Sequence, residues 1–338
     1  MRAGPLRLSL LVPGLLSPLP GVPGHSMPHG PALKKLLARA RRAPVPVDAD
    51  ALCYRLLGYA LSETHDHPDA WLSYQFDTGR VAPGPLLRAD PVHLRADQSR
   101  LLLFDAGQLH VTADEAQALA AAFNRHYAAD GLRLELPIPT RGYLHLPEQP
   151  DLRTTPLLRA IGRDVDACLP TGRDASAWHR FLNEVQMLFH DHPVNRAREA
   201  CGQPMINSLW LWGGGCPLTA VASEWQQIRS NDAALRGLAW LNGIRSAEPP
   251  MDARTWQNEV VDGQHLLHWD ALRRAAAYGD VEGWLTQTDY LEQAWFTPLL
   301  QALRQGCLRE LRLYPDDGWM YRVTRRDLWC FWRRFRVS

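Results

Sequence analysis

The hydrophobic and polar positions of this 338-residue chain alternate between two periods along its length. Short apolar runs bounded by turn residues are typical of buried strands, and apolar residues at helical spacing are typical of helices that pack on a sheet. The alternation predicts an α/β protein. The expected strands are Leu6–Val12, Leu132–Leu136, Asn207–Trp212, His265–Trp269, Glu310–Tyr314 and Met320–Val323, and the expected helices are Thr112–Tyr127, Trp178–Phe189, Leu272–Trp284 and Tyr290–Arg304.

Local signals mark where several of these elements begin and end. Thr112 with Glu115 three residues later forms a capping-box sequence at the start of a helix. Pro193 disfavours helical geometry in the residue before it and therefore ends the helix that begins near Trp178. The run Gly213–Gly215 allows either a sharp turn or the close approach of a ligand. Because no phosphate-loop or dinucleotide-binding motif surrounds this run, it favours a tight crossover between domains.

The composition narrows the functional classes. A chain of this length suits two domains, and its net charge of +1 gives no field that would recruit nucleic acid or a membrane. The six cysteines form no CxxC pair, which argues against a zinc or thioredoxin-type site and favours reduced thiols in the cytoplasm. The apolar start, Leu6–Leu16, has the flanks of a signal peptide but is interrupted at Pro13, so we expect a first strand there. No apolar run reaches the ~18 residues that a membrane span needs.

A resemblance to a known family comes from the stretch around residues 190–217. This stretch contains His192-Pro193-Val194-Asn195 followed by Arg198 and Gly202, and then Asn207-Ser208-Leu209-Trp210-Leu211-Trp212-Gly213-Gly214-Gly215. It resembles the end of the cap domain in archaeal-type cofactor-independent phosphoglycerate mutases, which belong to the alkaline phosphatase superfamily. It is more similar still to the bacterial proteins called regulatory protein RpfE, which share the Asn-Ser-Leu-Trp-Leu-Trp-Gly-Gly-Gly run and a basic, aromatic C-terminus.

The resemblance implies a fold with an inserted domain. Residues 1–85 and 216–338 are expected to form an alkaline phosphatase-like core, a mostly parallel sheet flanked by helices. Residues 86–215 are expected to form an inserted α/β cap domain like that of the mutases. The strand at Leu6–Val12 should then lie in one sheet with the strands at His265–Trp269 and Glu310–Tyr314, despite their separation in sequence.

The resemblance also implies a catalytic centre, and the residues of that centre are largely replaced here. Pro13 stands where the family has a metal-binding aspartate after the first strand. Ala49 stands at the position of the nucleophilic serine next to Asp50, and a shift of one residue brings Asp48 to that position. The Asp-x-x-Gly-His motif is absent between His265 and Asp280.

Two further carboxylate positions of the family centre are altered. Glu292 falls near a metal-binding aspartate of the family, and Asp316-Asp317 replaces an Asp-His pair. Two divalent metals need on the order of six protein ligands, so the sequence predicts no catalytic residue, no metal and no cofactor.

Two other groups of histidines are candidates for a metal site. His25 and His29 lie in a Pro- and Gly-rich loop without a third ligand nearby. His65-Asp66-His67 has suitable donors, but its position before a helix favours a polar turn. Neither group is included in the predicted site.

The resemblance implies a ligand site in the cap domain, where the mutases hold the carboxylate and phosphate of phosphoglycerate with arginines. Arg88, Arg141 and Arg153 stand in the matching motifs, and a guanidinium can bind either anion with two hydrogen bonds. The alternative is that these arginines pair with Asp90, Asp105 or Asp151. The ligand-binding candidates of the matching motifs are Arg88, Asp90, Arg141, Arg153, Thr154, Asn195 and Asn207.

The C-terminus, Arg322–Arg336, interleaves arginines with tryptophans and phenylalanines. Such a segment can stack bases and bind phosphates, can bind a partner protein, or can form a helix that buries its aromatic residues. We therefore expect a non-catalytic regulatory protein whose partner is a phosphorylated small molecule or a protein, with no membrane partner; nucleic acid is not favoured. The alternatives are an active metal-dependent mutase or phosphotransferase, and a nucleic-acid-binding regulator.

Overall fold

The computed structural model describes residues 5–16, 30–46, 48–62, 64–97, 100–330 and 332. The chain divides into two compact units: unit 1 comprises Met1–Ala60 with Ala220–Ser338, and unit 2 comprises Leu61–Thr219. Within the described ranges, no helix is long and apolar enough to cross a membrane. Of the sequence-based candidates, His25, His29 and the arginines at 333, 334 and 336 lie outside the described residues.

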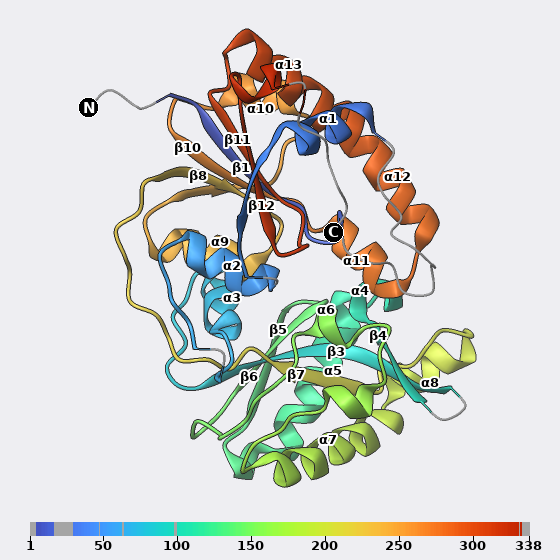
Figure 1. Cartoon of the computed structure of the whole chain (residues 1–338). Coiled ribbons are helices and arrows are strands. Elements are labelled where there is room, and N and C mark those ends of the chain that lie inside the picture. Colours follow the sequence, from blue (N-terminus) through green and yellow to red (C-terminus); the bar gives the residue numbers. More distant parts are fainter. Residues whose placement is uncertain are drawn as a thin grey trace. The chain divides into compact units, whose positions relative to one another are not determined.

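The described residues of unit 1 form a seven-stranded sheet in the order β2-β12-β11-β1-β10-β8-β9 (Figure 1). Strand β1 pairs in parallel with β10 on one side and β11 on the other, which confirms that these distant segments share one sheet. Strands β8 and β9 continue in parallel, whereas β12 is antiparallel to both β11 and β2. The strands are β1 Arg7–Leu11, β2 Arg41–Pro44, β8 Trp225–Arg229, β9 Arg245–Ala247, β10 Gln264–His268, β11 Glu310–Tyr314 and β12 Trp319–Thr324.

Helices lie against this sheet because alternate strand residues present apolar side chains to them. Leu8 and Leu10 of β1 belong to one buried cluster with the helices that follow β10. An expected helix over 272–284 is divided in two, because Gly279 adopts a positive φ of 66° and Asp280 caps a new helix. The helices are α1 Pro31–Arg39, α2 Ala49–Leu56, α9 Ala233–Leu241, α10 Ala253–Glu259, α11 Ala271–Tyr278, α12 Val281–Leu291, the π-turn η3 Glu292–Phe296, α13 Thr297–Gln305 and the short η4 Asp327–Trp329.

Unit 2 is built on an antiparallel sheet. Its described residues place the strands in the order β4-β3-β6-β5, and β7 also pairs with the long strand β3. Along β3, residues 86–88 pair with β6, residues 88–92 with β7 and residues 92–97 with β4. The strands are β3 Leu86–Asp97, β4 Arg100–Asp105, β5 Arg133–Ile138, β6 Arg141–His145 and β7 Ser208–Trp212.

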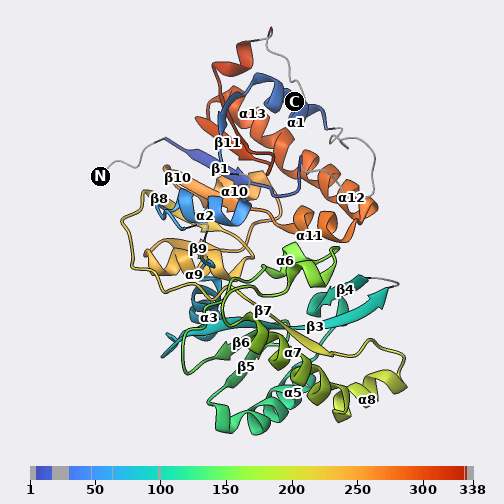
Figure 2. The same cartoon turned by 60° about the horizontal axis from the view of Figure 1, so that its bottom comes forward.

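Two helices cover one face of this sheet, and α3 packs on the other side of β6. Helices α5 and α7 lie together on that face (Figure 2). Phe123 of α5 and Phe181 of α7 meet edge to face inside a cluster that includes Leu211 of β7. The predicted capping box at Thr112 and Glu115 is confirmed at the start of α5. The helices are α3 Asp69–Thr78, α4 Ala106–Leu109, α5 Ala113–His126, η1 Ala128–Asp130, α6 Leu157–Ala160, η2 Val165–Cys168, α7 Ala175–His190 and α8 Pro193–Ala200.

The unit boundaries differ from the sequence-based ones at 85/86 and 215/216. Tyr74 of α3 packs edge to face on Tyr143 of β6 with ring centroids 5.2 Å apart, and the Ala70 N–H donates to the Gly213 carbonyl. Helix α3 therefore belongs to unit 2, which begins before this helix rather than after it. The strand β2 was not anticipated either, because Arg41–Pro44 carries no apolar alternation.

The Gly213–Gly215 run packs directly against the chain that enters α3. Gly213 has a φ of 71°, and a Cβ on Gly215 would lie 2.2 Å from the Asp66 carbonyl oxygen. A Cβ on Gly214 would lie 2.4 Å from the side chain of Leu87. Close packing inside unit 2 therefore accounts for all three glycines.

One glycine gives a stability prediction. A Cβ on Gly142 would lie 2.0 Å from the backbone oxygen of Ala89, which cannot move without displacing β3. We expect Gly142→Ala to lower the free energy of unfolding by about 3 kcal/mol, as overpacking does. Gly84→Ala is the matched control, because its Cβ would meet only one atom at 3.7 Å. Urea denaturation followed by circular dichroism would measure both, and equal stability of the two variants would contradict the prediction.

Candidate functional site

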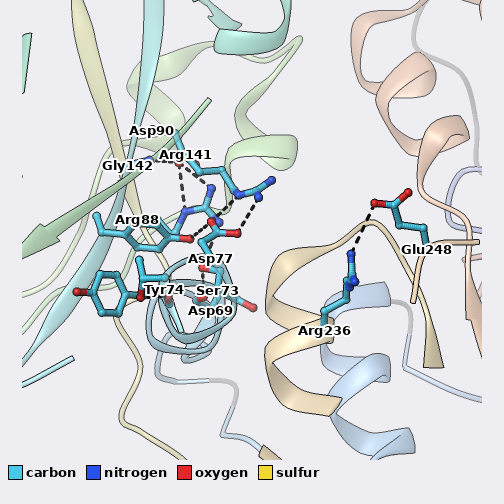
Figure 3. Close-up of polar contacts among 12 residues, drawn as sticks. Asp69, Ser73, Tyr74, Asp77, Arg88, Asp90, Arg141, Gly142, Arg236 and Glu248 are labelled. Atoms are coloured by element: carbon cyan, nitrogen blue, oxygen red, sulfur yellow. Dashed lines mark hydrogen bonds and ion pairs between the residues drawn. The ribbon is translucent and has the colours of Figure 1, made fainter. Parts of the chain in front are cut away.

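A buried ion pair lies on β3 at the centre of the unit 2 sheet. The Arg88 guanidinium donates from Nη2 to Oδ1 of Asp90 at 2.7 Å and from Nε to the same oxygen at 3.2 Å (Figure 3). Asp90 also accepts from the Gly142 N–H at 3.1 Å and from the Trp212 indole N–H at 2.7 Å. One carboxylate therefore joins β3, β6 and β7.

Aromatic rings complete the surroundings of Arg88. Its guanidinium carbon lies 4.9 Å from the ring centre of Trp212 and 5.4 Å from that of Tyr143. Burial opposes the charge, but the neighbouring Asp90 outweighs it and raises the pKa of Arg88 above its ordinary value. Nη1 of Arg88 donates to the Ser73 hydroxyl at 3.3 Å, so Arg88 remains charged and held on several sides.

Arg141 forms a second ion pair next to the Arg88–Asp90 pair. Its Nε and Nη2 donate to the two oxygens of Asp77 at 2.8 and 2.7 Å, which is a two-point guanidinium–carboxylate pair. Asp77 is buried on α3 and also accepts from the Tyr143 hydroxyl at 2.6 Å. Burial and the Asp77 carboxylate raise the pKa of Tyr143, so its phenol stays protonated as the donor.

The structure thus brings Arg88, Asp90 and Arg141 close together (Figure 3). Tyr143 joins the two pairs, because the Arg88 guanidinium lies over its ring and its hydroxyl donates to the partner of Arg141, Asp77. Of the two arginines, Arg88 is almost fully buried, whereas the side chain of Arg141 is 27% exposed. The pairing of Arg88 with Asp90 is one of the alternatives that the sequence left open. The other carboxylates considered there serve elsewhere: Asp105 caps α4, and Asp151 pairs with Arg173.

Arg153 and Thr154 lie in the segment after β6. Arg153 is exposed, and its backbone forms a bridge with Thr171. The Thr154 N–H and hydroxyl both donate to the Asp66 carboxylate, and the Thr154 hydroxyl accepts from the Gly213 N–H at 3.1 Å. Asp66, from the His65-Asp66-His67 group, therefore fixes this segment to the end of β7.

Asn195 and Asn207 hold the loop between α8 and β7. The Asn195 amide donates to the carbonyls of Phe189 and Ile206 and accepts from the Ile206 N–H, each at 2.8 Å. The Asn207 amide accepts from the Leu94 N–H and donates to the Leu94 carbonyl, as a strand neighbour would. Both amides are therefore occupied by backbone groups.

A second cluster lies where the parallel strands of unit 1 end, the edge at which the resemblance places the metals. Pro13 and Gly14 follow β1, and a Cβ on Gly14 would lie 3.1 Å from backbone atoms of Leu272 and Arg273. Helix α11 thus packs directly on this turn. Its Arg273 pairs with both oxygens of Asp50, with Nη2 at 2.8 Å from Oδ2.

Arg273 supplies a fixed positive charge at this edge. Burial opposes its charge, but Asp50, Asp316 and Asp232 together raise the pKa of Arg273 above its ordinary value. At the neighbouring strand ends, the Ser230 hydroxyl lies 3.1 Å from Nδ1 of His268. Nowhere in the described ranges do three or more His, Cys, Asp or Glu side chains gather closely enough to hold a metal ion.

The remaining carboxylates that the resemblance singled out have protein partners. Glu292 accepts from the N–H groups of Ala32 and Leu33 at 2.6 and 3.0 Å and so caps the start of α1. Asp48 caps α2 through the Asp50 N–H. Asp317 accepts from the Trp319 N–H and the Tyr321 hydroxyl. Each of these carboxylates therefore has a structural role in the fold.

Sequence reasoning missed Asp77 and Arg273, the groups that balance charge in the two clusters. Asp77 lies on α3, far in sequence from Arg141, and no spacing signals the pair. Arg273 had one signal, its place just after the strand at 265–269, where a parallel sheet presents groups to a ligand.

Comparison with known proteins finds weak homology between this chain and phosphoglycerate mutases. A 2,3-bisphosphoglycerate-independent phosphoglycerate mutase from Methanothrix thermoacetophila is 26% identical over 227 residues, 61% of this chain and 57% of that protein. The protein of the same name from Methanosarcina mazei is 24% identical over 200 residues, 55% of this chain and 48% of that protein. The chain therefore matches about half the length of these curated relatives, and no model of a known protein family matches it.

A solved structure shares the fold. The PH0037 protein from Pyrococcus horikoshii superposes over 95% of this chain and 88% of its own, with a TM-score of 0.52 and 13% sequence identity. The findings together show a mixed α/β protein with weak homology to cofactor-independent phosphoglycerate mutases.

The buried ion pair yields the prediction of this section. Arg88→Met leaves the fully buried Asp90 carboxylate without its cation, and breaking one side of a buried pair costs about 3–5 kcal/mol of unfolding free energy. Arg173→Met removes a pair with Asp151 that is largely exposed, and we expect a loss below about 1 kcal/mol. Urea denaturation would compare the two, and a loss as small for Arg88 as for Arg173 would refute the assigned role.

Proposed function

We propose that this protein is a non-catalytic regulatory relative of the cofactor-independent phosphoglycerate mutases, of the RpfE type, with an alkaline phosphatase-like core. The observation that carries the proposal is the pairing of Arg273 with Asp50 at the carboxyl ends of the parallel strands. The homology supports a mutase-like ancestry. The Arg273–Asp50 pair supports the second part of the proposal, that the catalytic chemistry of the mutases has been lost.

The described side chains at this edge of the sheet do not provide the ligands that a pair of divalent metal ions needs. Such a centre needs on the order of six ligands, mostly His and Asp for manganese or zinc. Here Asp50 is engaged by a guanidinium, Glu292 caps a helix, and Asp317 holds its own turn. A metal ion near Arg273 would also meet the repulsion of a fixed positive charge.

The position of the nucleophile supports the same proposal. Ala49, the first residue of α2, has no oxygen that could attack phosphorus. The carboxylate of Asp48, the neighbouring candidate, accepts a hydrogen bond from the Asp50 N–H and so caps the start of that helix. Activation of Asp48 would require breaking the hydrogen bond that caps α2.

A ligand site of the proposed regulator falls on Arg141 in unit 2. The side chain of Arg141 is partly exposed, and its bonds to Asp77 run through Nε and Nη2, leaving Nη1 for an anion. Arg88 offers less, because Asp90 and Ser73 occupy its nitrogens. A phosphorylated acid bound here would be recognised without being converted, since binding and bond breaking use different groups.

The absence of turnover is the first expected outcome. We expect the purified full chain to show no phosphoglycerate mutase or phosphatase activity with manganese, zinc or magnesium, and a metal content well below one ion per chain by mass spectrometry. The physical reason is the loss of the nucleophile, which alone costs several orders of magnitude in rate. Robust turnover that disappears in Arg141→Ala would show that the chemistry has moved to other residues.

Ligand binding is the second expected outcome. Isothermal titration with 3-phosphoglycerate should give a measurable heat that Arg141→Ala abolishes. Arg133→Ala is the matched control, because it removes an exposed arginine of the same unit that pairs with Glu135 instead. Absence of heat with the unaltered chain, or equal heat with both variants, would remove the ligand from the proposal.

A further inference from the structure

Two segments from opposite ends of the sequence form one basic surface in unit 1. Strand β2 pairs antiparallel with β12, and η4 follows β12 directly. Nη1 of Arg39 donates to the Cys330 carbonyl at 2.8 Å, and Nε of Arg41 donates to Asp327 at 2.9 Å. The N-terminal α1 and the C-terminal strands therefore lie side by side (Figure 1).

The charged side chains of these two segments are mostly positive. Residues 31–46 contain five Lys or Arg side chains and no Asp or Glu, and residues 322–332 contain three arginines and one acidic residue, Asp327. Asp327 is 1% exposed and is held by Thr324 as well as Arg41, so its charge is turned inward. Arg325 and Arg326 are exposed, and among the described residues no carboxylate pairs with either side chain.

Aromatic side chains stand within this basic surface. Trp329 is 75% exposed and Trp332 is 67% exposed. The alternative in which the C-terminus buries its aromatic residues on the sheet is therefore wrong for these two. We define the terminal basic surface by its described residues Lys35, Arg39, Arg41, Arg325, Arg326, Trp329 and Trp332.

We propose that the terminal basic surface binds single-stranded nucleic acid. Guanidinium and ammonium groups contact the phosphates, and the exposed indoles stack on bases. Stacking on an indole requires a base free of its partner strand, which favours a single strand over a duplex. This binding goes beyond the proposed function and does not depend on it, because the surface shares no residue with the Arg141 site or with Arg273.

The physical basis of this binding is local. The net charge of the chain is +1, so attraction comes from the cluster and not from the whole molecule. Association then depends strongly on salt, because each phosphate that is neutralised on a single strand changes the slope of log K against log salt by about 0.7.

The test is fluorescence anisotropy with a fluorescein-labelled 15-nucleotide oligo-dT and the full chain, from 50 to 300 mM NaCl. We expect binding that weakens with salt. Arg325→Ala/Arg326→Ala should weaken binding about tenfold or more and reduce the salt slope by about 1.4. Trp329→Ala should weaken binding about tenfold and leave the slope unchanged, because it removes stacking and no charge.

Matched controls separate this surface from general charge effects. Arg180→Ala/Arg196→Ala removes two exposed arginines of unit 2, and Trp240→Ala removes an exposed tryptophan of α9; both should bind as the unaltered chain does. Thermal unfolding would verify that every variant is folded. The proposal is overturned if oligo-dT does not bind at 50 mM NaCl, if a 15-base-pair duplex binds equally well, or if the controls weaken binding as much. Binding to anionic vesicles or to a poly-glutamate peptide in place of oligo-dT would also overturn it and would identify a different partner.

Discussion

The carboxylate of Asp90 is the group on which unit 2 depends most. A charge buried in the middle of a sheet is costly unless every lone pair finds a donor. Asp90 finds Arg88 on its own strand, the Gly142 N–H on β6 and the Trp212 indole on β7. These donors are in place only when three strands are in their native register, so one acidic side chain specifies how the sheet is assembled.

In unit 1 the charges that must be neutralised lie at the ends of the parallel strands, not in the middle of the sheet. Where parallel strands end, the polar groups usually face a ligand. Here Arg273 of α11 meets Asp50, with Asp232 and Asp316 near enough to stabilise its charge. The charge balance that a bound ion would give is thus achieved within the chain itself. In both units an arginine and an aspartate neutralise each other at a position where the family resemblance led us to expect a ligand.

The sequence predicted those features that depend on local pattern. Strands β1, β10 and β11 are short apolar runs, and the capping box of α5 is written in four residues. The Arg88–Asp90 pair was among the alternatives, and the two side chains meet because residues two apart share one face of a strand. Strand β2 could not be predicted, since Arg41–Pro44 is polar and is held by pairing with the distant β12. The pairings of Asp77 with Arg141 and of Arg273 with Asp50 likewise depend on tertiary packing, which no spacing in the sequence reveals.

The position of β1 has a consequence for the order in which the chain acquires structure as it leaves the ribosome. Strand β1 is made before the strands of unit 2, but its neighbours β10 and β11 lie at residues 264–268 and 310–314. All the strands of unit 2 have been made by residue 212. The inserted unit can therefore complete its sheet while β1 waits unpaired, exposed to other chains and to chaperones. Strand β1 thus waits longer for its hydrogen-bond partners than any strand of unit 2 does.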